Sequence, residues 1–426
     1  MHGDFSQLTF SPLNHFSSVL RLQGRVDVDA DANEATAILL HYVRTLAADL
    51  IGPYGGPAAD AGFEIDVTRQ SGRVTAISAG AGRYYVDGVL AENTGDDPVD
   101  VPEKLPVLAY LKVWERLVTA VEDPGIRDVA LGAGGPDSSA RTQVVWQVIL
   151  TASPPGSKGA FTLKSKAEKD LRAELLTRWR DGWHDALQPV GVALLRARAK
   201  SGDDDPEPCA LSPFARYRGP ENQLYRVEVH DDSTFKWSRD NGSVVFPIDS
   251  ITQSQVVVST LGRDDLLSLE VGQWVEVIDD AYTAAAAPAP LYRVALVEEL
   301  DRRVTLDRVV SGDVGRDPDL HPFLRRWDQL GDIEDGVVPI TEGSPGDVWL
   351  DLEDGVQVQF ESGPYRPGDY WLIPARTETG DVIWPSTDGE PDALRPRGPT
   401  IHYAPLGFIT DTAVVDLRLV FDALAS

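Results

Sequence analysis

Residues 17–57 read SSVLRLQGRVDVDADANEATAILLHYVRTLAADLIGPYGGP, and this stretch joins an extended arm to the longest helix that the sequence predicts. Asp31 stands as an N-cap and Glu34 follows three residues later, which is the spacing of a capping box. Apolar residues then recur at helical spacing until Gly52 and Pro53. The pattern therefore predicts a helix that starts after Asp31 and ends before Gly52.

The predicted helix carries two apolar stripes. We expect the main stripe to face the protein's own core; its members are Ala35, Ile38, Leu39, Tyr42, Val43, Leu46 and Leu50. The second, thinner stripe consists of Ala37, Leu40, Ala47 and Ile51. A helix that is apolar on more than one face must be covered on more than one face. We expect another subunit to cover the second stripe; the alternative is a helix buried within its own domain.

The residues before the helix predict an extended arm, because aromatic side chains stand there among Ser, Pro and Asn. Such an arm is expected either to lie across a neighbouring subunit or to pack on its own domain. The arm and the helix together form the candidate assembly interface, which comprises Phe5, Phe10, Phe16, Arg25, Asp29, Asp31, Asn33, Glu34, Leu40, Ala47 and Ile51.

The composition is that of a folded, acidic protein. With 426 residues, 42% of them hydrophobic, the chain is long enough for about three domains. The single cysteine, Cys209, cannot form an intramolecular disulfide, which favours assembly in the reducing cytoplasm. The chain has no 18-residue apolar run and no signal-like start, so we expect neither membrane insertion nor secretory export.

Net charge and motif content exclude several classes of function. A net charge of −28 opposes nucleic-acid binding, because phosphates require clustered Lys and Arg. Asp27, Asp29 and Asp31 alternate like the start of a calcium loop, but Ala32 and Ile38 occupy its Gly and Glu positions. The histidines have no metal-ligand spacing, and no nucleophile elbow, P-loop or H-E-x-x-H motif occurs. We therefore expect no catalytic residues, no cofactor and no metal.

The sequence predicts an α+β fold that is mostly β. We expect an N-terminal arm and anchoring helix (1–60), an α+β domain (61–200), a β domain with a small barrel (210–310) and a C-terminal β-rich domain (311–426). The signals are an Asp87-Gly88 hairpin, a helical stripe within 163–187, a solvated linker at 201–208 and evenly spaced strands over 266–306.

The ten tryptophans suggest one alternative function, which is sugar binding. Most of them lie within strand patterns and are expected in the core, but Trp327 and Trp384 are expected at the surface, where they could stack on sugars. Paired carboxylates could serve a glycosidase. Such pairs are common in a chain with 67 acidic residues, so they carry little information.

Several blocks of the chain resemble a family of uncharacterised proteins associated with phage-tail-like contractile injection systems. The first block runs from Leu20 to Glu34 and contains Gln23-Gly24-Arg25-Val26 and Asp29-Ala30-Asp31-x-Asn33-Glu34. That family commonly has Q-G-R-V-x-L-D-A-D-W-N-E, and this chain departs from it at residues 27, 28 and 32. Further blocks include Val113-Trp-Glu-Arg116, Gly368-Asp-Tyr-Trp-Leu-Ile-Pro-Ala-Arg376 and His402-Tyr-Ala-Pro-Leu406.

The resemblance implies a structural subunit of a contractile injection particle, associated with its baseplate and assembled in the cytoplasm. Its partners would be baseplate, tube or sheath proteins and further copies of itself. The alternatives are a tail-fibre module that binds a receptor or glycan and, third, a polysaccharide-degrading enzyme.

Overall fold

The computed structural model describes residues 2–132, 137–164, 167–188, 193–200, 217–262, 267–279, 288–329, 333–343, 348–398 and 400–423. The fold is α+β and mostly β, as predicted. The chain forms two compact units, each assembled from separate segments. Unit 1 comprises Met1–Leu8, Leu117–Arg141 and Gly191–Pro399, and unit 2 comprises Thr9–Arg116, Thr142–Val190 and Thr400–Ser426.

These units differ from the consecutive domains predicted over 1–60, 61–200, 210–310 and 311–426. Strand β25 (Ile401–Ile409) pairs antiparallel with β7 (Val107–Val118), so the C-terminal segment completes a sheet that begins near residue 107. Local sequence patterns do not reveal which distant strands pair. The predicted linker at 201–208 lies outside the described residues.

Unit 2 contains three small sheets, with the strand orders β27–β1–β4–β5, β2–β3–β6 and β26–β25–β7–β8. Their remaining strands are β1 (Tyr54–Pro57), β2 (Ile65–Gln70), β3 (Arg73–Ala79), β4 (Gly82–Val86), β5 (Val89–Asn93), β6 (Asp97–Val99), β8 (Arg141–Thr151), β26 (Val414–Asp416) and β27 (Val420–Phe421). Asp87 and Gly88 have positive φ angles of 49° and 78° and join β4 to β5, which confirms the predicted hairpin.

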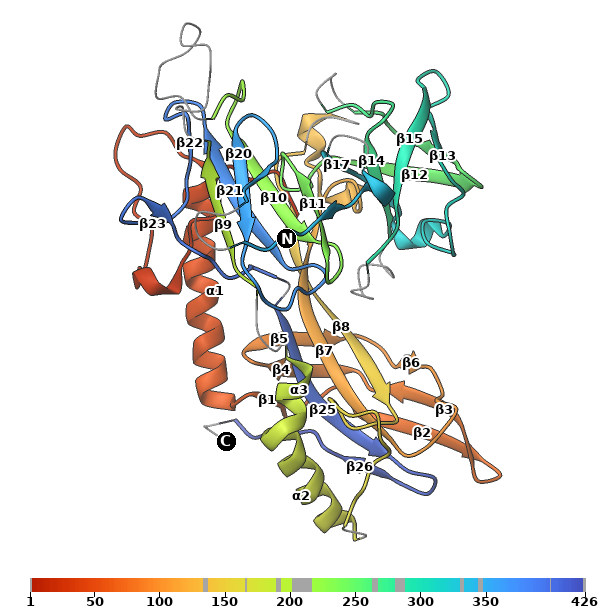
Figure 1. The fold of residues 1–426 in the computed structure, drawn as a ribbon. Helices are drawn as coiled ribbons and strands as arrows, with labels where there is room; N and C mark the ends of the chain where they lie inside the picture. The colour runs from red at the N-terminus through yellow and green to blue at the C-terminus, as the bar shows by residue number, and fades with distance from the viewer. Residues whose placement is uncertain are drawn as a thin grey trace, which may run out of the picture. The chain divides into compact units, whose positions relative to one another are not determined.

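The helices of unit 2 are α1 (Asp29–Ile51), α2 (Glu168–Arg178) and α3 (His184–Leu187), with a π-helical turn (Trp179–Trp183) between α2 and α3. The predicted helical stripe of residues 163–187 is confirmed as core, because Leu171, Leu175, Trp179 and Trp183 are buried with the sheet residues. Helix α2 lies beside β26, and only the C-terminal end of α1 reaches the sheet that contains β1 and β4 (Figure 1).

Unit 1 contains a two-layered sandwich. One layer has the order β18–β11–β10–β21–β22 and the other β19–β20–β9, and they enclose one core that includes Tyr225, Trp237, Phe360 and Trp371. The strands are β9 (Leu195–Ala199), β10 (Gln223–Val229), β11 (Thr234–Ser238), β18 (Val338–Pro339), β19 (Leu350–Asp351), β20 (Val356–Phe360), β21 (Tyr370–Arg376) and β22 (Asp381–Val382). A separate short pair is β23 (Ser386–Thr387) with β24 (Glu390–Pro391).

The second part of unit 1 is a closed barrel with the order β12–β13–β16–β15–β14–β17. Its strands are β12 (Val245–Thr252), β13 (Gln255–Val258), β14 (Trp274–Ile278), β15 (Leu291–Glu298), β16 (Arg303–Leu306) and β17 (Phe323–Trp327). Branched side chains such as Val256, Val277 and Leu324 form its core. The predicted barrel over 266–306 is thus present but larger, because β12, β13 and β17 close it. Single 3₁₀ turns occur at Pro12–Asn14, Pro124–Ile126, Val129–Leu131, Pro318–Leu320 and Glu334–Gly336.

Candidate assembly surface

Helix α1 contacts its own unit along one narrow face. Two guanidinium nitrogens of Arg44 donate to the two carboxylate oxygens of Glu115 on β7, at 2.8 and 2.7 Å. The backbone of Arg44 lies directly over Gly88, where a Cβ would come within 2.1 Å of the Arg44 carbonyl oxygen. At the C-terminal end of the helix, Ile51 packs on Gly55 of β1. These contacts fix α1 to unit 2 through its C-terminal half.

The opposite face of α1 is apolar and exposed. Of the 23 residues of the helix, only Ala30 and Ile38 are buried. The exposed side chains are Leu39 (61% exposed), Tyr42 (66%), Val43 (50%), Leu46 (47%) and Leu50 (65%). They recur at intervals of three and four residues and therefore share one side of the helix.

The structure reverses the two predicted stripes. Ala47 and Ile51, which were assigned to a partner, are half-buried on the side that faces unit 2, while Leu40 lies at its margin and is 41% exposed. Except for the buried Ile38, the main stripe that was assigned to the core faces solvent. The prediction was wrong because it assumed that the broader stripe always faces the core. Here Gly88 and Gly55 let the thinner, smaller stripe approach the sheet closely.

The predicted capping box is also absent. Helix α1 begins at Asp29, and its N-cap is Val28, which makes no side-chain capping bond. Glu34 instead accepts a hydrogen bond of 2.6 Å from the Thr9 hydroxyl. Asp29 and Asp31 occupy the first turn, where their negative charges interact favourably with the positive end of the helix dipole. Asn33 is exposed beside them.

Residues 11–28, which we call the arm loop, start beside the middle of α1 and end just before its first residue. Before the loop, the Phe10 ring lies 5.6 Å from the His41 ring, and after it the chain enters α1 at Asp29. The loop contains one 3₁₀ turn and no strand, and a turn joins Leu22 to Arg25. Its exposed apolar residues are Leu13 (82%), Phe16 (61%), Leu20 (80%), Leu22 (68%), Val26 (87%) and Val28 (48%). Phe16 and Arg25 of the predicted interface therefore lie on an exposed segment.

The first residues of the chain have a different environment. Phe5 and Leu8 pack against Leu224, Tyr370 and Leu372 of unit 1. The Arg376 guanidinium donates to the Ser6 carbonyl oxygen at 2.9 Å. Phe5 therefore belongs to a segment, residues 2–8, that is tucked on its own unit, which is the second of the two predicted alternatives for the arm.

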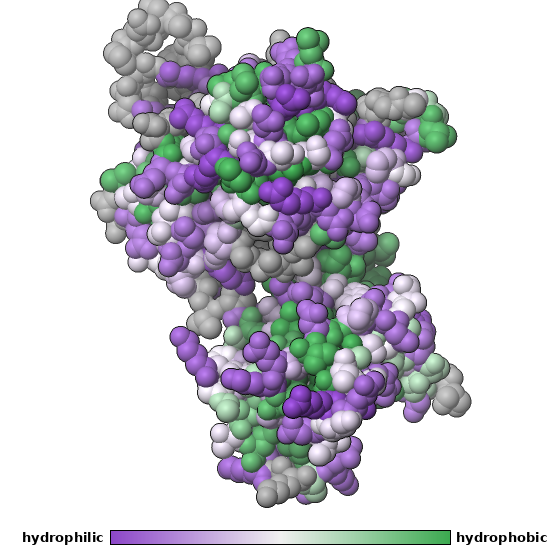
Figure 2. All heavy atoms as spheres, turned by 90° about the vertical axis from the view of Figure 1, so that its right-hand side faces the viewer, coloured by the Kyte–Doolittle hydropathy of each residue, from purple (hydrophilic) through white to green (hydrophobic). Residues whose placement is uncertain are grey.

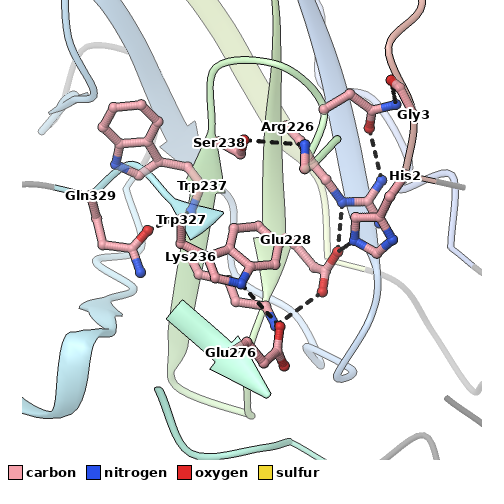
Figure 3. A network of polar contacts seen from close by, with 12 residues as sticks. His2, Gly3, Arg226, Glu228, Lys236, Trp237, Ser238, Glu276, Trp327 and Gln329 are labelled. Atoms are coloured by element: carbon pink, nitrogen blue, oxygen red, sulfur yellow. Dashed lines mark hydrogen bonds and ion pairs between the residues drawn. The ribbon is translucent and has the colours of Figure 1, made fainter. Parts of the chain in front are cut away.

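The segment 2–8 is held by a buried polar network (Figure 3). The Gly3 N–H donates to the Asn241 carbonyl oxygen, and the Asn241 side-chain amide donates to the Gly3 carbonyl oxygen at 2.9 Å. His2 Nε2 lies 3.0 Å from Glu228, whose carboxylate also accepts from Arg226 Nε at 2.6 Å. Arg226 and Glu228 lie in a further sequence block, residues 217–228, that resembles the same family, and Asn241 lies in an Asn-Gly turn. The sequence did not show that these residues meet His2 and Gly3, since they come from β10, a loop and the first few residues of the chain.

The network continues toward the barrel. Lys236 of β11 donates to both carboxylate oxygens of Glu276 on β14, at 2.9 and 2.8 Å. Trp327 of β17 donates its indole N–H to Glu276 at 3.0 Å, and Lys236 Nζ lies 4.3 Å from the centre of a Trp327 ring. Within unit 1, these groups tie the five-stranded sheet to the barrel.

Burial and neighbouring cations keep His2 neutral. Desolvation, followed by the charges of Arg226 and Arg325, places the pKa of His2 well below its ordinary value of 6.5. Burial alone would raise the pKa of Glu228, but Arg226 and Lys236 hold it well below its usual range. A neutral imidazole that donates from Nε2 to the Glu228 carboxylate is consistent with both shifts.

Mild acid should therefore weaken the docking of residues 2–8. Because the pKa of His2 is lowered in the folded protein, the undocked segment binds more protons below about pH 6.5. The contribution of neutral His2 to docking is fully present above that pH. It falls by up to about 1.4 kcal/mol for each pH unit below it. Limited proteolysis near residue 8 should accelerate on going from about pH 7.5 to about pH 5.5.

The control for this prediction is His2→Asn, which keeps a donor toward Glu228 and does not titrate. Asp240, whose pKa burial raises to about 6, titrates in this range in both proteins, and His230, whose pKa burial lowers, is also present in both. An equal acceleration of cleavage in wild type and His2→Asn would show that His2 is not the sensitive group.

Alternative sites find less support. The expectation that Trp327 is exposed was wrong: it is fully buried, because its indole completes the Lys236–Glu276 contact. Trp384 is half-buried against the core of the sandwich. Within the described residues, no group of three His, Cys, Asp or Glu side chains is placed to hold a metal. The same part of the chain has no helix long and apolar enough to cross a membrane.

The arm loop and α1 concentrate the exposed apolar surface. Twelve of the 23 large hydrophobic residues exposed in the described chain lie between Leu13 and Leu50. Figure 2 also shows hydrophobic side chains on the face of unit 2 that is turned to the viewer. In unit 2, the apolar side chains of β8 are less exposed than those of the arm loop, because they are half-buried and pack against the core of the unit. We therefore take the arm loop and the exposed face of α1 as the candidate functional surface.

Comparison with known proteins gives one match. The model of a family of unknown function, DUF6519, matches residues 1–157 and 184–419, which include the arm loop and α1. No curated protein and no solved structure matches the chain.

Proposed function

This chain belongs to DUF6519, a family of unknown function, and we propose that it is a structural subunit that docks into a larger particle through the arm loop and α1. The particle that we propose is a phage-tail-like contractile injection system, with the subunit at its baseplate. The sequence blocks from Leu20 to Glu34, around Trp114 and around Trp371 support this choice of particle.

The observation that carries the proposal is the exposed apolar surface. Soluble monomers rarely expose contiguous apolar patches of more than a few hundred Å². Burying a leucine or valine side chain contributes about 1.5–3 kcal/mol. A dozen partly exposed side chains therefore offset the cost of association, which is on the order of 4–15 kcal/mol.

The charge of the arm loop indicates the chemistry of its partner. The arm loop contains one acidic residue, Asp27, and two basic residues, Arg21 and Arg25, in a protein whose net charge is −28. Arg21 reaches Asp27 at 3.1 Å, where both side chains are exposed. An acidic surface with an apolar groove is the complementary partner for such a segment.

Replacing Leu20 and Leu22 together by aspartate should prevent incorporation into the particle while leaving the free protein folded. Both side chains are more than two-thirds exposed, so the change removes little from the protein's own packing. It places two carboxylates where an apolar contact is expected, which costs several kcal/mol of association. The measurement is the amount of subunit in particles purified by sedimentation from cells that express the complete particle.

Leu300→Asp provides the matched control, because Leu300 is fully exposed on the β15–β16 turn of unit 1. This variant should enter particles like the wild type. Normal incorporation of the Leu20→Asp, Leu22→Asp variant would contradict the proposed docking surface. Wild-type protein that is absent from purified particles would contradict the proposed particle.

A further inference from the structure

The turn Asn241-Gly242 in unit 1 combines a reactive sequence with complete burial. It is the only Asn-Gly pair in the chain. An asparagine before glycine is prone to deamidate, because no side chain on the glycine keeps its backbone nitrogen away from the asparagine side chain. Asn241 is 0% exposed, and Gly242 is buried beside it. The turn therefore has the chemistry of a modification site but is shielded from solvent.

Three hydrogen bonds engage the groups that would react. The Asn241 side-chain amide donates to the Gly3 carbonyl oxygen at 2.9 Å, and the Asn241 side-chain oxygen accepts from Arg226 at 3.1 Å. The Gly242 N–H donates to the Ser238 hydroxyl at 3.1 Å. Figure 3 labels the three partners Gly3, Arg226 and Ser238. Both the amide that would leave and the nitrogen that would attack are thus held in place.

Segment 2–8 covers this turn. Besides accepting from the Asn241 side chain, Gly3 donates its N–H to the Asn241 carbonyl oxygen at 3.3 Å. The His2 ring lies so close to Gly242 that a Cβ added there would come within 2.6 Å of it. Two residues of the segment therefore contact the reactive pair directly.

We propose that Asn241 is a deamidation site that segment 2–8 keeps closed while it is docked, and that deamidation prevents the segment from docking again. In the reaction, the Gly242 nitrogen loses its proton and bonds to the side-chain carbonyl carbon of Asn241. The carbon–nitrogen bond of the side-chain amide breaks, and its nitrogen leaves as ammonia. Water then opens the cyclic imide to aspartate or isoaspartate.

Docking opposes this reaction because ring closure destroys two of the three hydrogen bonds. The cyclic imide has no N–H to donate to Ser238, and its formation removes the amide nitrogen that donates to Gly3. Both oxygens would lose a donor in a site that is shielded from solvent, which is unfavourable. The reaction therefore requires the segment to leave first, and its rate follows the fraction of protein in which the segment is undocked.

The product is also incompatible with docking. An aspartate at position 241 presents a carboxylate oxygen to the Gly3 carbonyl oxygen, in place of an N–H, so that two acceptors face each other. Arg226 can still donate to the other carboxylate oxygen, so the loss falls on Gly3. Isoaspartate adds a carbon to the backbone and displaces the carbonyl oxygen that accepts from the Gly3 N–H. Deamidation thus makes a reversible release of the segment permanent.

Peptide mass spectrometry tests the first part of the proposal on the purified full chain, after incubation in mildly alkaline buffer. The tryptic peptide 240–263 has Asn241 as its only asparagine. Leu8→Asp should undock the segment, because Leu8 packs against apolar residues of β10 and β21. Deamidation should be about tenfold faster in this variant than in wild type, or more, and should approach the rate of the urea-unfolded chain.

Leu300→Asp is the matched control, because Leu300 is fully exposed on the β15–β16 turn, and it should deamidate at the wild-type rate. Phe5→Asp is a second undocking variant. The melting temperature shows that each variant is folded, and limited proteolysis near residue 8 shows that the segment is undocked. Slow deamidation in wild type and in folded, undocked variants alike would overturn the proposal. Folded wild type that deamidates as fast as the unfolded chain would overturn it as well.

Asn241→Asp imitates the product and tests the second part of the proposal, which does not depend on the kind of particle. Limited proteolysis near residue 8 should be about tenfold faster than in wild type, because a buried hydrogen bond is replaced by a repulsion. The control is Asn222→Asp, which should behave like the wild type. Asn222 is exposed, and its side-chain oxygen, which aspartate keeps, accepts from Thr377. Unchanged proteolysis of Asn241→Asp would show that deamidation does not release the segment.

Discussion

Replacing Glu276 by alanine should lower the free energy of unfolding of unit 1 by about 3–5 kcal/mol, because it breaks a buried ion pair. The Glu276 carboxylate is 2% exposed and accepts from Lys236 and from the indole N–H of Trp327. Its removal would leave an ammonium and an indole N–H buried beside a cavity. The Glu228 carboxylate also lies 3.4 Å from Lys236, but it is already bonded to Arg226.

Urea denaturation followed by tryptophan fluorescence measures this loss. The control is Glu299→Ala, because Glu299 is exposed on the turn between β15 and β16 of the same barrel. It should stay within about 0.5 kcal/mol of the wild type. Equal stability of the two variants would mean that the Lys236–Glu276 contact does not hold the sheet to the barrel.

Replacing Gly88 by alanine should detach the C-terminal half of α1 and cost about 3 kcal/mol of stability. Gly88 has a φ of 78°, which a side chain disfavours, and its added Cβ would meet the Arg44 carbonyl oxygen at 2.1 Å. Because that oxygen belongs to the helix backbone, α1 itself would have to move. The movement would also strain the Arg44–Glu115 contact.

Gly72→Ala separates these two effects. Gly72 has the same φ of 78° in the turn between β2 and β3, but its added Cβ would meet nothing within 4 Å. This variant should lose only about 1–2 kcal/mol. Hydrogen exchange of residues 39–51 should accelerate in Gly88→Ala and not in Gly72→Ala. Identical behaviour of the two variants would show that α1 does not depend on its contact with the hairpin.

The sequence predicted local features reliably where a short pattern has one physical solution. Asp87-Gly88 between apolar pairs predicted the β4–β5 hairpin, since both turn residues must accept positive φ. The stripe through Leu171 and Trp179 predicted a buried helix, and it is buried. The even spacing of short strands predicted a barrel, which the structure contains in a larger form.

Contacts between distant segments could not be predicted in this way. No local pattern indicates that β25 pairs with β7, or that His2 meets Glu228, because both contacts join residues far apart in the sequence. The same reason explains why Trp327 was expected at the surface. Its burial depends on Glu276 and Lys236, which come from two other strands.

Helix α1 shows most clearly which features depend on the local sequence and which depend on the tertiary structure. The sequence by itself determined that residues near 29–51 form a helix with apolar residues on two sides, because helical periodicity and the terminal Gly52 are local properties. Which side faces the protein was decided only by the tertiary structure. The carboxylate of Glu115 and the bare backbone of Gly88 lie beneath Arg44, and they turn Leu39, Leu46 and Leu50 outward.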